Sequence, residues 1–242
     1  YTTLFRSNFN IGFDFELFNS RLRGSVEYFY KKTTDMLCFV EAPNSAGYKG
    51  SYDNIGDMVN KGLEVDLSAT VLKKKNISWD VNVNATTYKN EIAKLADALK
   101  ADLVVDGHPG YVSGDRLYAE GLPLYTWYIR RYAGLSEEGK SMWYYTDNDG
   151  NLQKTDVYGN ATYYNCGSPH PDLYGGFGTT LSAYGFDLSV SFSYSLGGKA
   201  YDFGYASLMG VPIGTSGGCA IHRDALNAWS ADNPTSDIPR WQ

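Results

Sequence analysis

The chain carries one sequence that could support nucleophilic catalysis. Gly214-Thr215-Ser216-Gly217-Gly218 matches the G-x-S-x-G pattern of the nucleophile elbow of serine hydrolases. That elbow requires a buried strand before the serine and a histidine that follows the triad acid along the chain. Here Pro212 and glycines surround the serine, and the one histidine that follows it, His222, comes only six residues later. We interpret this segment as a Gly/Ser loop and predict no catalytic residue.

A second group could bind a metal ion. Asp147, Asp149 and Asn151 place three oxygen-bearing side chains on one turn, and oxygen ligands suit calcium. An EF-hand loop would need its glycine at the sixth position and an acid at the twelfth, and neither register fits this segment. Asp-Gly is a common hairpin turn, so the sequence favours a plain turn, with a calcium site as the alternative. No other cofactor is predicted.

A third group could bind sugars. The middle of the chain is rich in aromatic residues mixed with Asp, Asn and Arg. Flat rings can stack on sugar faces while neighbouring amides and carboxylates bond hydroxyl groups, although the same rings could pack loops against each other. The residues we predict for ligand contact are Tyr111, Tyr118, Trp127, Trp143, Tyr144 and Tyr145.

The histidines and cysteines do not form a recognisable site. His108 and His170 each lie beside a proline with no partner pattern, and we expect them to be solvated loop residues. Cys38, Cys166 and Cys219 are odd in number and irregular in spacing, which fits neither a metal site nor a full disulfide framework. A bridge between Cys38 and Cys166 stays open.

Composition limits the class of protein. The formal net charge is −6 and the pI is near 5.1, so there is no basic surface of the kind that nucleic acid requires. The longest apolar run, Met36 to Val40, is far below the roughly 18 residues of a spanning helix. Tyr1 is not an initiator residue and no signal peptide is visible, so we expect a processed chain or a fragment.

Apolar and polar residues alternate along the strands that are expected to position the candidate groups. From Phe186 to Ser195, apolar or aromatic residues occupy the even positions and Asp or Ser the odd ones, as in a strand with one apolar face. Similar runs of about nine to eleven residues match the length that a tilted strand needs to cross a bilayer. They include Phe9 to Leu17, Leu63 to Val71 and Ile77 to Ala85.

The alternation predicts which side chains face lipid. We expect the apolar set to face the bilayer and the polar set to face a barrel lumen. The apolar set is Phe13, Phe15, Val81, Val83, Val190 and Phe192, and the polar set is Asp14, Glu16, Asn82, Asn84, Ser189 and Ser191.

Short and long connections alternate between the predicted strands. Three hairpins are predicted, with strands 6–18 and 21–33, 60–72 and 77–88, and 175–183 and 186–195. Their turns are short, whereas the segments 34–59, 89–174 and 196–242 are long and rich in Gly, Pro, Asp, Asn and Tyr. Outer-membrane barrels have short periplasmic turns and long extracellular loops. A carbohydrate-binding β-sandwich with two packed sheets is the alternative on pattern alone.

An ordered set of motifs resembles one family. Asn54-Ile-Gly-Asp-Met-Val-Asn60-Lys61-Gly62-Leu-Glu64 precedes a strand, a basic turn, Trp79-Asp-Val-Asn-Val-Asn84 and Lys89-Asn90. Further matches follow in order, at Gly121-Leu-Pro with Trp127-Tyr128, Asp147-Asn-Asp-Gly150, Pro171 with Tyr174-Gly-Gly-Phe177, Trp229 with Asn233-Pro234-Thr235, and Pro239-Arg240. From about residue 54 to 240, the chain resembles the late barrel region of SusC-like TonB-dependent receptors, glycan importers of Bacteroidetes outer membranes.

The resemblance implies an all-β fold, an antiparallel transmembrane β-barrel, of which residues 1–242 would supply about seven or eight of about 22 strands. The plug domain and the final barrel strands would lie outside this chain. It implies a non-enzymatic, TonB-energised importer of oligosaccharides in the Gram-negative outer membrane, with oligopeptides as the alternative substrate. The implied partners are a SusD-like surface lipoprotein, the TonB complex through an N-terminal segment outside this chain, and outer-membrane lipid, with no nucleic acid.

Overall fold

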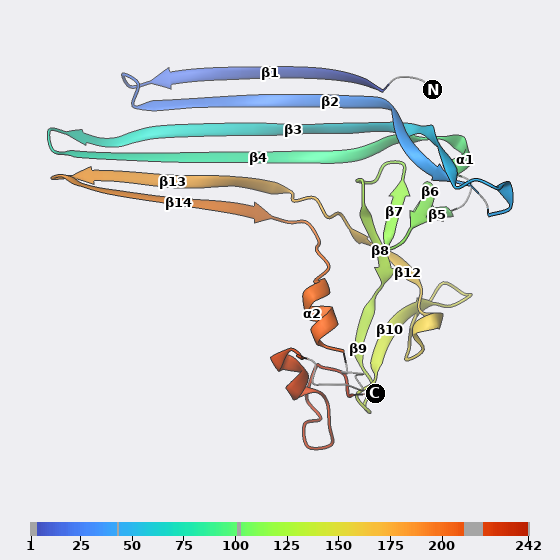
Figure 1. Ribbon diagram of the computed structural model, residues 1–242. Helices are drawn as coiled ribbons and strands as arrows, with labels where there is room; N and C mark the ends of the chain where they lie inside the picture. The colour runs from blue at the N-terminus through green and yellow to red at the C-terminus, as the bar shows by residue number, and fades with distance from the viewer. Residues whose placement is uncertain (1–3, 43, 101–102, 211–219, 242) are drawn as a thin grey trace. The chain divides into compact units, whose positions relative to one another are not determined.

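The computed structural model describes residues 4–42, 44–100, 103–210 and 220–241. Its main element is a six-stranded antiparallel sheet whose strands lie side by side (Figure 1). In sheet order these are β1 (Phe5–Leu17), β2 (Leu22–Glu41), β3 (Gly50–Lys74), β4 (Ile77–Leu95), β13 (Leu173–Ala183) and β14 (Phe186–Leu196). We expected seven or eight such strands, and the long sheet of the described residues contains six.

The register of this sheet separates the side chains into two faces. One row of cross-strand partners is polar or small and consists of Asp14, Ser25, Asp66, Asn84, Gly176 and Ser193. The adjacent row is mostly apolar and consists of Phe15, Gly24, Leu67, Val83, Phe177 and Phe192. Because neighbouring rows point to opposite faces, the predicted division into an apolar and a polar face is confirmed across all six strands.

The apolar face is not covered by another layer of the described chain. Phe13 is 67% exposed, Val83 43% and Phe192 53%. The fully buried large side chains lie elsewhere, at Ile92, Leu95, Leu117 and Thr126. An uncovered apolar surface of this extent requires a partner that is itself apolar.

The strands extend further than the alternation predicts. β2 continues to Glu41 and β3 starts at Gly50, so most of the segment 34–59 is strand rather than loop. Register shifts between Thr33 and Met36 and between Asp57 and Met58 interrupt the ladder, and Asp35 has a φ of 53°. Such bulges remove the strict two-residue period from the sequence, which explains why these extensions were missed.

The hairpin turns are short, as predicted. Ala183 pairs with Phe186, and the two residues between them, Tyr184 and Gly185, have φ values of 51° and 88°. Positive φ at both central residues is the property of a type I′ turn, which matches the twist of the flanking strands. Lys74 pairs with Ile77 around a turn of two residues, within the predicted turn 73–76.

The segment predicted as one long loop, 89–174, is mostly folded. After β4 come the short helix α1 (Asp97–Lys100) and the strands β5 (Leu103–Val105), β6 (His108–Ser113), β7 (Arg116–Ala119) and β8 (Thr126–Arg130). They belong to a sheet with the order β12-β8-β7-β6-β5, in which β12 spans Tyr163–Gly167. A third sheet has the order β11-β10-β9, formed by Leu152–Thr155, Ser141–Thr146 and Tyr132–Leu135.

The chain divides into two compact units. The first contains Tyr1–Trp127 and Gly167–Lys199, and the second contains Tyr128–Cys166 and Ala200–Gln242. The second unit also holds the helix α2 (Phe203–Leu208) and the 3-10 turns η2 (Tyr158–Asn160) and η3 (Arg223–Asn227), while η1 (Asn44–Ala46) lies in the first. In the described part of the chain, every helix is too short or too polar to span a bilayer.

Candidate functional site

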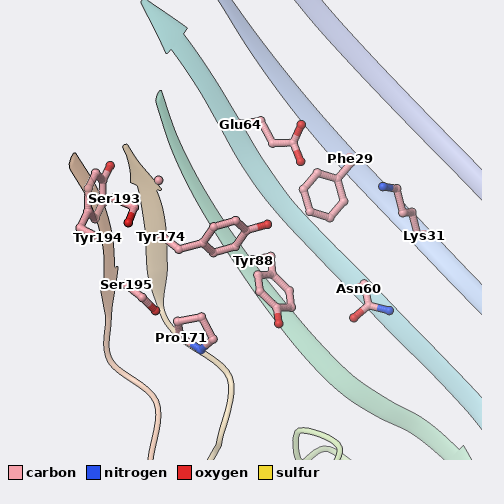
Figure 2. A pocket seen from close by; sticks show the side chains of 11 residues that line it. Phe29, Lys31, Asn60, Glu64, Tyr88, Pro171, Tyr174, Ser193, Tyr194 and Ser195 are labelled. Atoms are coloured by element: carbon pink, nitrogen blue, oxygen red, sulfur yellow. The ribbon is translucent and has the colours of Figure 1, made fainter. Parts of the chain in front are cut away.

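A hollow of ≈ 900 Å³ lies on the polar face of the long sheet (Figure 2). Aromatic, charged and amide side chains from β2, β3, β4 and β13 line it. They include Phe29, Lys31, Asn60, Glu64, Tyr88 and Tyr174. This combination can contact the flat, apolar parts of a polar solute and also bond its polar groups.

A glycine makes room for the aromatic floor of the hollow. Gly62 pairs with Phe29 on one side and with Tyr88 on the other. A Cβ atom at Gly62 would lie 2.8 Å from the Phe29 ring and would clash with the Thr87 carbonyl. The missing side chain lets the Phe29 ring lie over the sheet, where it is only 6% exposed.

Tyr88 is held between two aromatic neighbours. The Tyr174 ring meets it edge to face, with centroids 6.0 Å apart at 84°, an arrangement that aromatic pairs favour. The Tyr88 hydroxyl lies 3.2 Å from Nδ1 of His170, and Nε2 of His170 lies 3.1 Å from the Leu124 carbonyl. The carbonyl can only accept, so these partners assign the proton to Nε2 and make Nδ1 the acceptor for Tyr88. The prediction of His170 as a solvated loop residue is wrong.

Asn90 joins the wall of the sheet to the loop that follows β7. Its side chain is 6% exposed, donates to Oδ1 of Asn60 at 2.7 Å and accepts the Leu124 N–H at 2.7 Å. A buried amide with both ends bonded fixes the position of both partners. Together with His170, Asn90 therefore holds the Leu124 backbone against the rim of the hollow.

A second cluster closes the end of β4. Oε1 of Glu120 accepts the Leu95 N–H at 2.8 Å and lies 2.9 Å from Nζ of Lys100. The Leu95 N–H first, and then the Lys100 ammonium, hold the pKa of the Glu120 carboxyl below its ordinary value. Nδ1 of His108 donates to the Glu120 carbonyl at 2.6 Å, so His108 is also a partnered residue and not the solvated one that was predicted.

The first three aromatic residues predicted for ligand contact lie in the first unit. The rings of Tyr111 and Tyr118 stack on each other across β6 and β7, with centroids 5.1 Å apart at 11°. Trp127 is 6% exposed, carries the Arg116 guanidinium 3.1 Å from its ring centroid and donates its indole N–H to the Lys199 carbonyl at 2.7 Å. The Trp127 ring therefore packs the fold and offers little surface to a ligand.

The other three lie in the second unit, on consecutive positions of β10. Trp143 and Tyr145 share one face of that strand, and Tyr144 points to the other. The Trp143 ring meets Tyr158 edge to face at 5.1 Å, whereas Tyr144 lies near Arg131 and Lys154. Tyr144 thus faces away from Trp143 and Tyr145 within this unit, and ligand contact at any one of the six residues stays a prediction.

The hollow itself was not predicted, because its rings are far apart in the sequence. Tyr88 and Tyr174 each end an ordinary run of alternating residues, and only the pairing of β4 with β13 brings them together. The one signal in the sequence is Gly62, a glycine inside an alternating strand, which indicates a close approach by a neighbouring group.

The acidic turn is built by its own backbone. Oδ1 of Asp147 accepts the N–H groups of Asn151 at 2.8 Å and of Asp149 at 3.0 Å, and Gly150 has a φ of 83°. The Asn151 N–H is the main cause that lowers the pKa of the Asp147 carboxyl. No cluster of three or more His, Cys, Asp or Glu is placed to hold a metal within the described residues. The calcium site thus stays a prediction without support from this geometry.

The remaining candidates fall partly outside the described residues. The Gly214 to Gly218 segment with Ser216 lies there, as do Cys219 and the side chain of Cys38. Nδ1 of His222 accepts the Asp224 N–H at 3.1 Å and caps a 3-10 turn. Cys166 is a free cysteine whose thiol donates to the Ile129 carbonyl at 3.7 Å.

Comparison with known proteins identifies the fold. Residues 6–206 match the family described as "TonB dependent receptor-like, beta-barrel". The chain belongs to this family. TonB-dependent receptors are transporters of the Gram-negative outer membrane and not enzymes. The predictions of fold and location are confirmed. The apolar face of the long sheet is therefore the face that meets lipid, and the polar face with the hollow is the lumenal one.

The chain is also similar to individual TonB-dependent receptors, SusC among them. TonB-dependent receptor P26 of Formosa agariphila is 29% identical over 97% of this chain, and TonB-dependent receptor SusC of Bacteroides thetaiotaomicron is 26% identical over 81%. The structure of the RagAB peptide transporter aligns with 98% of the chain at 28% identity and a TM-score of 0.77. The chain spans 24% of the P26 receptor and 26% of the RagAB chain, or about a quarter of each.

Proposed function

We propose that this barrel segment belongs to a TonB-energised importer of the SusC and RagA type, which moves an oligosaccharide across the outer membrane. The family match over residues 6–206 carries the proposal. A barrel wall with a lipid face and a lumenal face is what a transported polar solute requires, because the solute passes on the side from which lipid is excluded.

The lining of the lumenal hollow supports an oligosaccharide as the substrate. Tyr174 is 40% exposed and leans over the hollow beside Tyr88, as Figure 2 shows, so one ring stays open to a ligand. The Asn60 side chain and the hydroxyls of Ser193 and Ser195 lie around these rings and can bond sugar hydroxyl groups. An apolar ring face next to such groups matches the amphipathic faces of a sugar ring.

An oligopeptide is the second candidate, and two observations favour it. The solved structure similar to this chain over 98% of its length is described as a peptide transporter. The hollow also contains one cation and one anion, at Lys31 and Glu64. These could bind the carboxylate and the ammonium group of a short peptide.

The partners of the full receptor are inferred from the similarity to the RagAB structures and from the family. We infer that a SusD-like surface lipoprotein covers the extracellular side of the full receptor, since the similar solved structures are of a two-part RagAB assembly. We also infer that a segment outside this chain contacts the TonB complex, because the family is defined by that energy source.

Calorimetry on the purified full-length receptor tests the substrate. Tyr174→Ala should weaken oligosaccharide binding by about fivefold or more, a figure that corresponds to about 1 kcal/mol for one lost stacking contact. Tyr184→Ala, at an exposed short turn on another part of the sheet, is the matched control and should not change the affinity. If Lys31→Gln and Glu64→Gln instead weaken binding of a short peptide and sugars do not bind, the substrate is a peptide. Failure of the full receptor to bind or import either class would refute the proposal.

A further inference from the structure

Two lysines face each other on the lipid side of the sheet. Lys61 of β3 and Lys89 of β4 are direct cross-strand partners in an undisturbed stretch of the ladder. They lie in the same row as Tyr30, and the next row on that face is Tyr28, Leu63 and Thr87. Like charges that are directly opposite each other destabilise a sheet unless an anion offsets them.

Protein carboxylates do not supply that anion. In the described part of the chain, no salt bridge within 4.0 Å is formed by Lys61 or Lys89, whereas the neighbouring Lys32 pairs with Asp57 at 3.3 Å. Glu91 follows Lys89 on the same face of β4 and pairs across the ladder with Val59.

The lysines lie at one boundary of the apolar band. Lys61 is twelve residues from Lys73, which begins the basic turn at the other end of β3. At about 3.3 Å per residue and a tilt of about 40°, this corresponds to roughly 30 Å along the bilayer normal, the thickness of a hydrocarbon core. The Lys61 and Lys89 ammonium groups are therefore at the depth of the lipid headgroups.

We propose that Lys61 and Lys89 form a binding site for the phosphate of a membrane lipid. The acyl chains of this lipid lie along the adjoining apolar surface, beginning with Leu63, which is 39% exposed. A cationic pair that continues directly into an apolar face fits an amphiphile better than a free anion, because both parts of the lipid are bound. The site is on the opposite face from the lumenal hollow, so it is independent of the substrate.

Binding of three probes to the detergent-purified full-length receptor, measured by native mass spectrometry, tests the site. The probes are dioctanoyl phosphatidic acid, dioctanoylglycerol and inorganic phosphate. We expect the phosphatidic acid to bind more tightly than either of the others. Lys61→Gln should weaken its binding by about fivefold, and Lys61→Gln with Lys89→Gln by about thirtyfold. Lys31→Gln is the matched control, because Lys31 is next to Tyr30 in β2 but on the lumenal face.

Several results would overturn the proposal. Unchanged binding in the double variant, or an equal loss in Lys31→Gln, would show that the lysine pair is not the site. If inorganic phosphate binds as tightly as phosphatidic acid, the lysines bind a free anion and not a lipid. If dioctanoylglycerol binds as tightly as phosphatidic acid, the charge of the phosphate does not contribute to binding. If the glutamine variants do not fold, the double variant Lys61→Arg with Lys89→Arg must retain phosphatidic acid binding. The comparison of the three probes on the native receptor also tests the proposal without any variant.

Discussion

Replacing Val83 by Arg should destabilise the receptor barrel by about 2 to 4 kcal/mol, the range for a cationic side chain on the lipid face at the bilayer midplane. Val83 pairs with Leu67, which is six residues from Lys61 and six from Lys73, so it lies midway between the two lysines that mark the ends of the apolar band on β3. It is 43% exposed on the apolar face, between Leu67 and Phe177 in the row. The expected cost corresponds to a factor of roughly 30 to 1000 in the folding equilibrium.

The adjacent residue provides the matched control. Asn84 lies on the lumenal face, opposite Asp66 on one strand and Gly176 on the other. An arginine at Asn84 gains a carboxylate partner and meets no opposing side chain at Gly176, so its cost should be near zero. Urea titrations of folding into phosphatidylcholine vesicles, followed by heat-modifiable gel mobility, give both values on the full receptor. Equal costs for Val83→Arg and Asn84→Arg would refute the assignment of the two faces.

Three further outcomes follow from the structure. Asn90→Ala should leave the Leu124 N–H and the Asn60 amide each short of a partner and lower the free energy of unfolding by about 1 to 3 kcal/mol. Faster hydrogen exchange at the Leu124 amide, with no change at a distant residue such as Val190, would verify this loss. The pKa of the Glu120 carboxyl is lowered in the fold, so Glu120 should stabilise the end of β4 fully above its ordinary pKa of 4.5 and progressively less as the pH falls below that value. Hydrogen exchange of the Leu95 amide, measured against pH, should report this loss. The same pH dependence of exchange in Glu120→Gln would contradict the prediction. In a background without cysteines, Lys74→Cys at a short turn should resist an impermeant thiol reagent on intact cells and react after permeabilisation, whereas rapid labelling of intact cells would reverse the topology.

The faces of the sheet could be predicted from the sequence, because lipid on one side and polar groups on the other enforce a period of two. Val81, Val83, Asn82 and Asn84 show this directly. The extensions of β2 and β3 could not be predicted in the same way. These extensions form because their backbones pair with neighbouring strands. Bulges near Asp35 and Asp57 break the two-residue alternation there, so the sequence pattern does not show them.

The lumenal hollow could not be predicted, because its chemistry depends on register. Tyr88 and Tyr174 come together only when β13 pairs with β4, and a one-residue shift would move Tyr174 to the lipid face. Aromatic content alone did not distinguish rings that pack the fold from exposed ones. Trp127 is covered by Arg116 and bonded to Lys199, which the sequence around Trp127 does not indicate.

Site-directed spin labelling along β4 tests the central claim most directly, namely that one face of the sheet meets lipid and the other the lumen. Labels placed one at a time from Trp79 to Thr86, in the full receptor reconstituted into vesicles, would be compared for collisions with oxygen and with a water-soluble nickel complex. We expect high oxygen accessibility at Trp79, Val81, Val83 and Ala85 and low values at the residues between them, because oxygen concentrates in the hydrocarbon core. An accessibility profile without a two-residue period, or with its maxima at Asn82 and Asn84, would contradict the lipid-facing barrel wall.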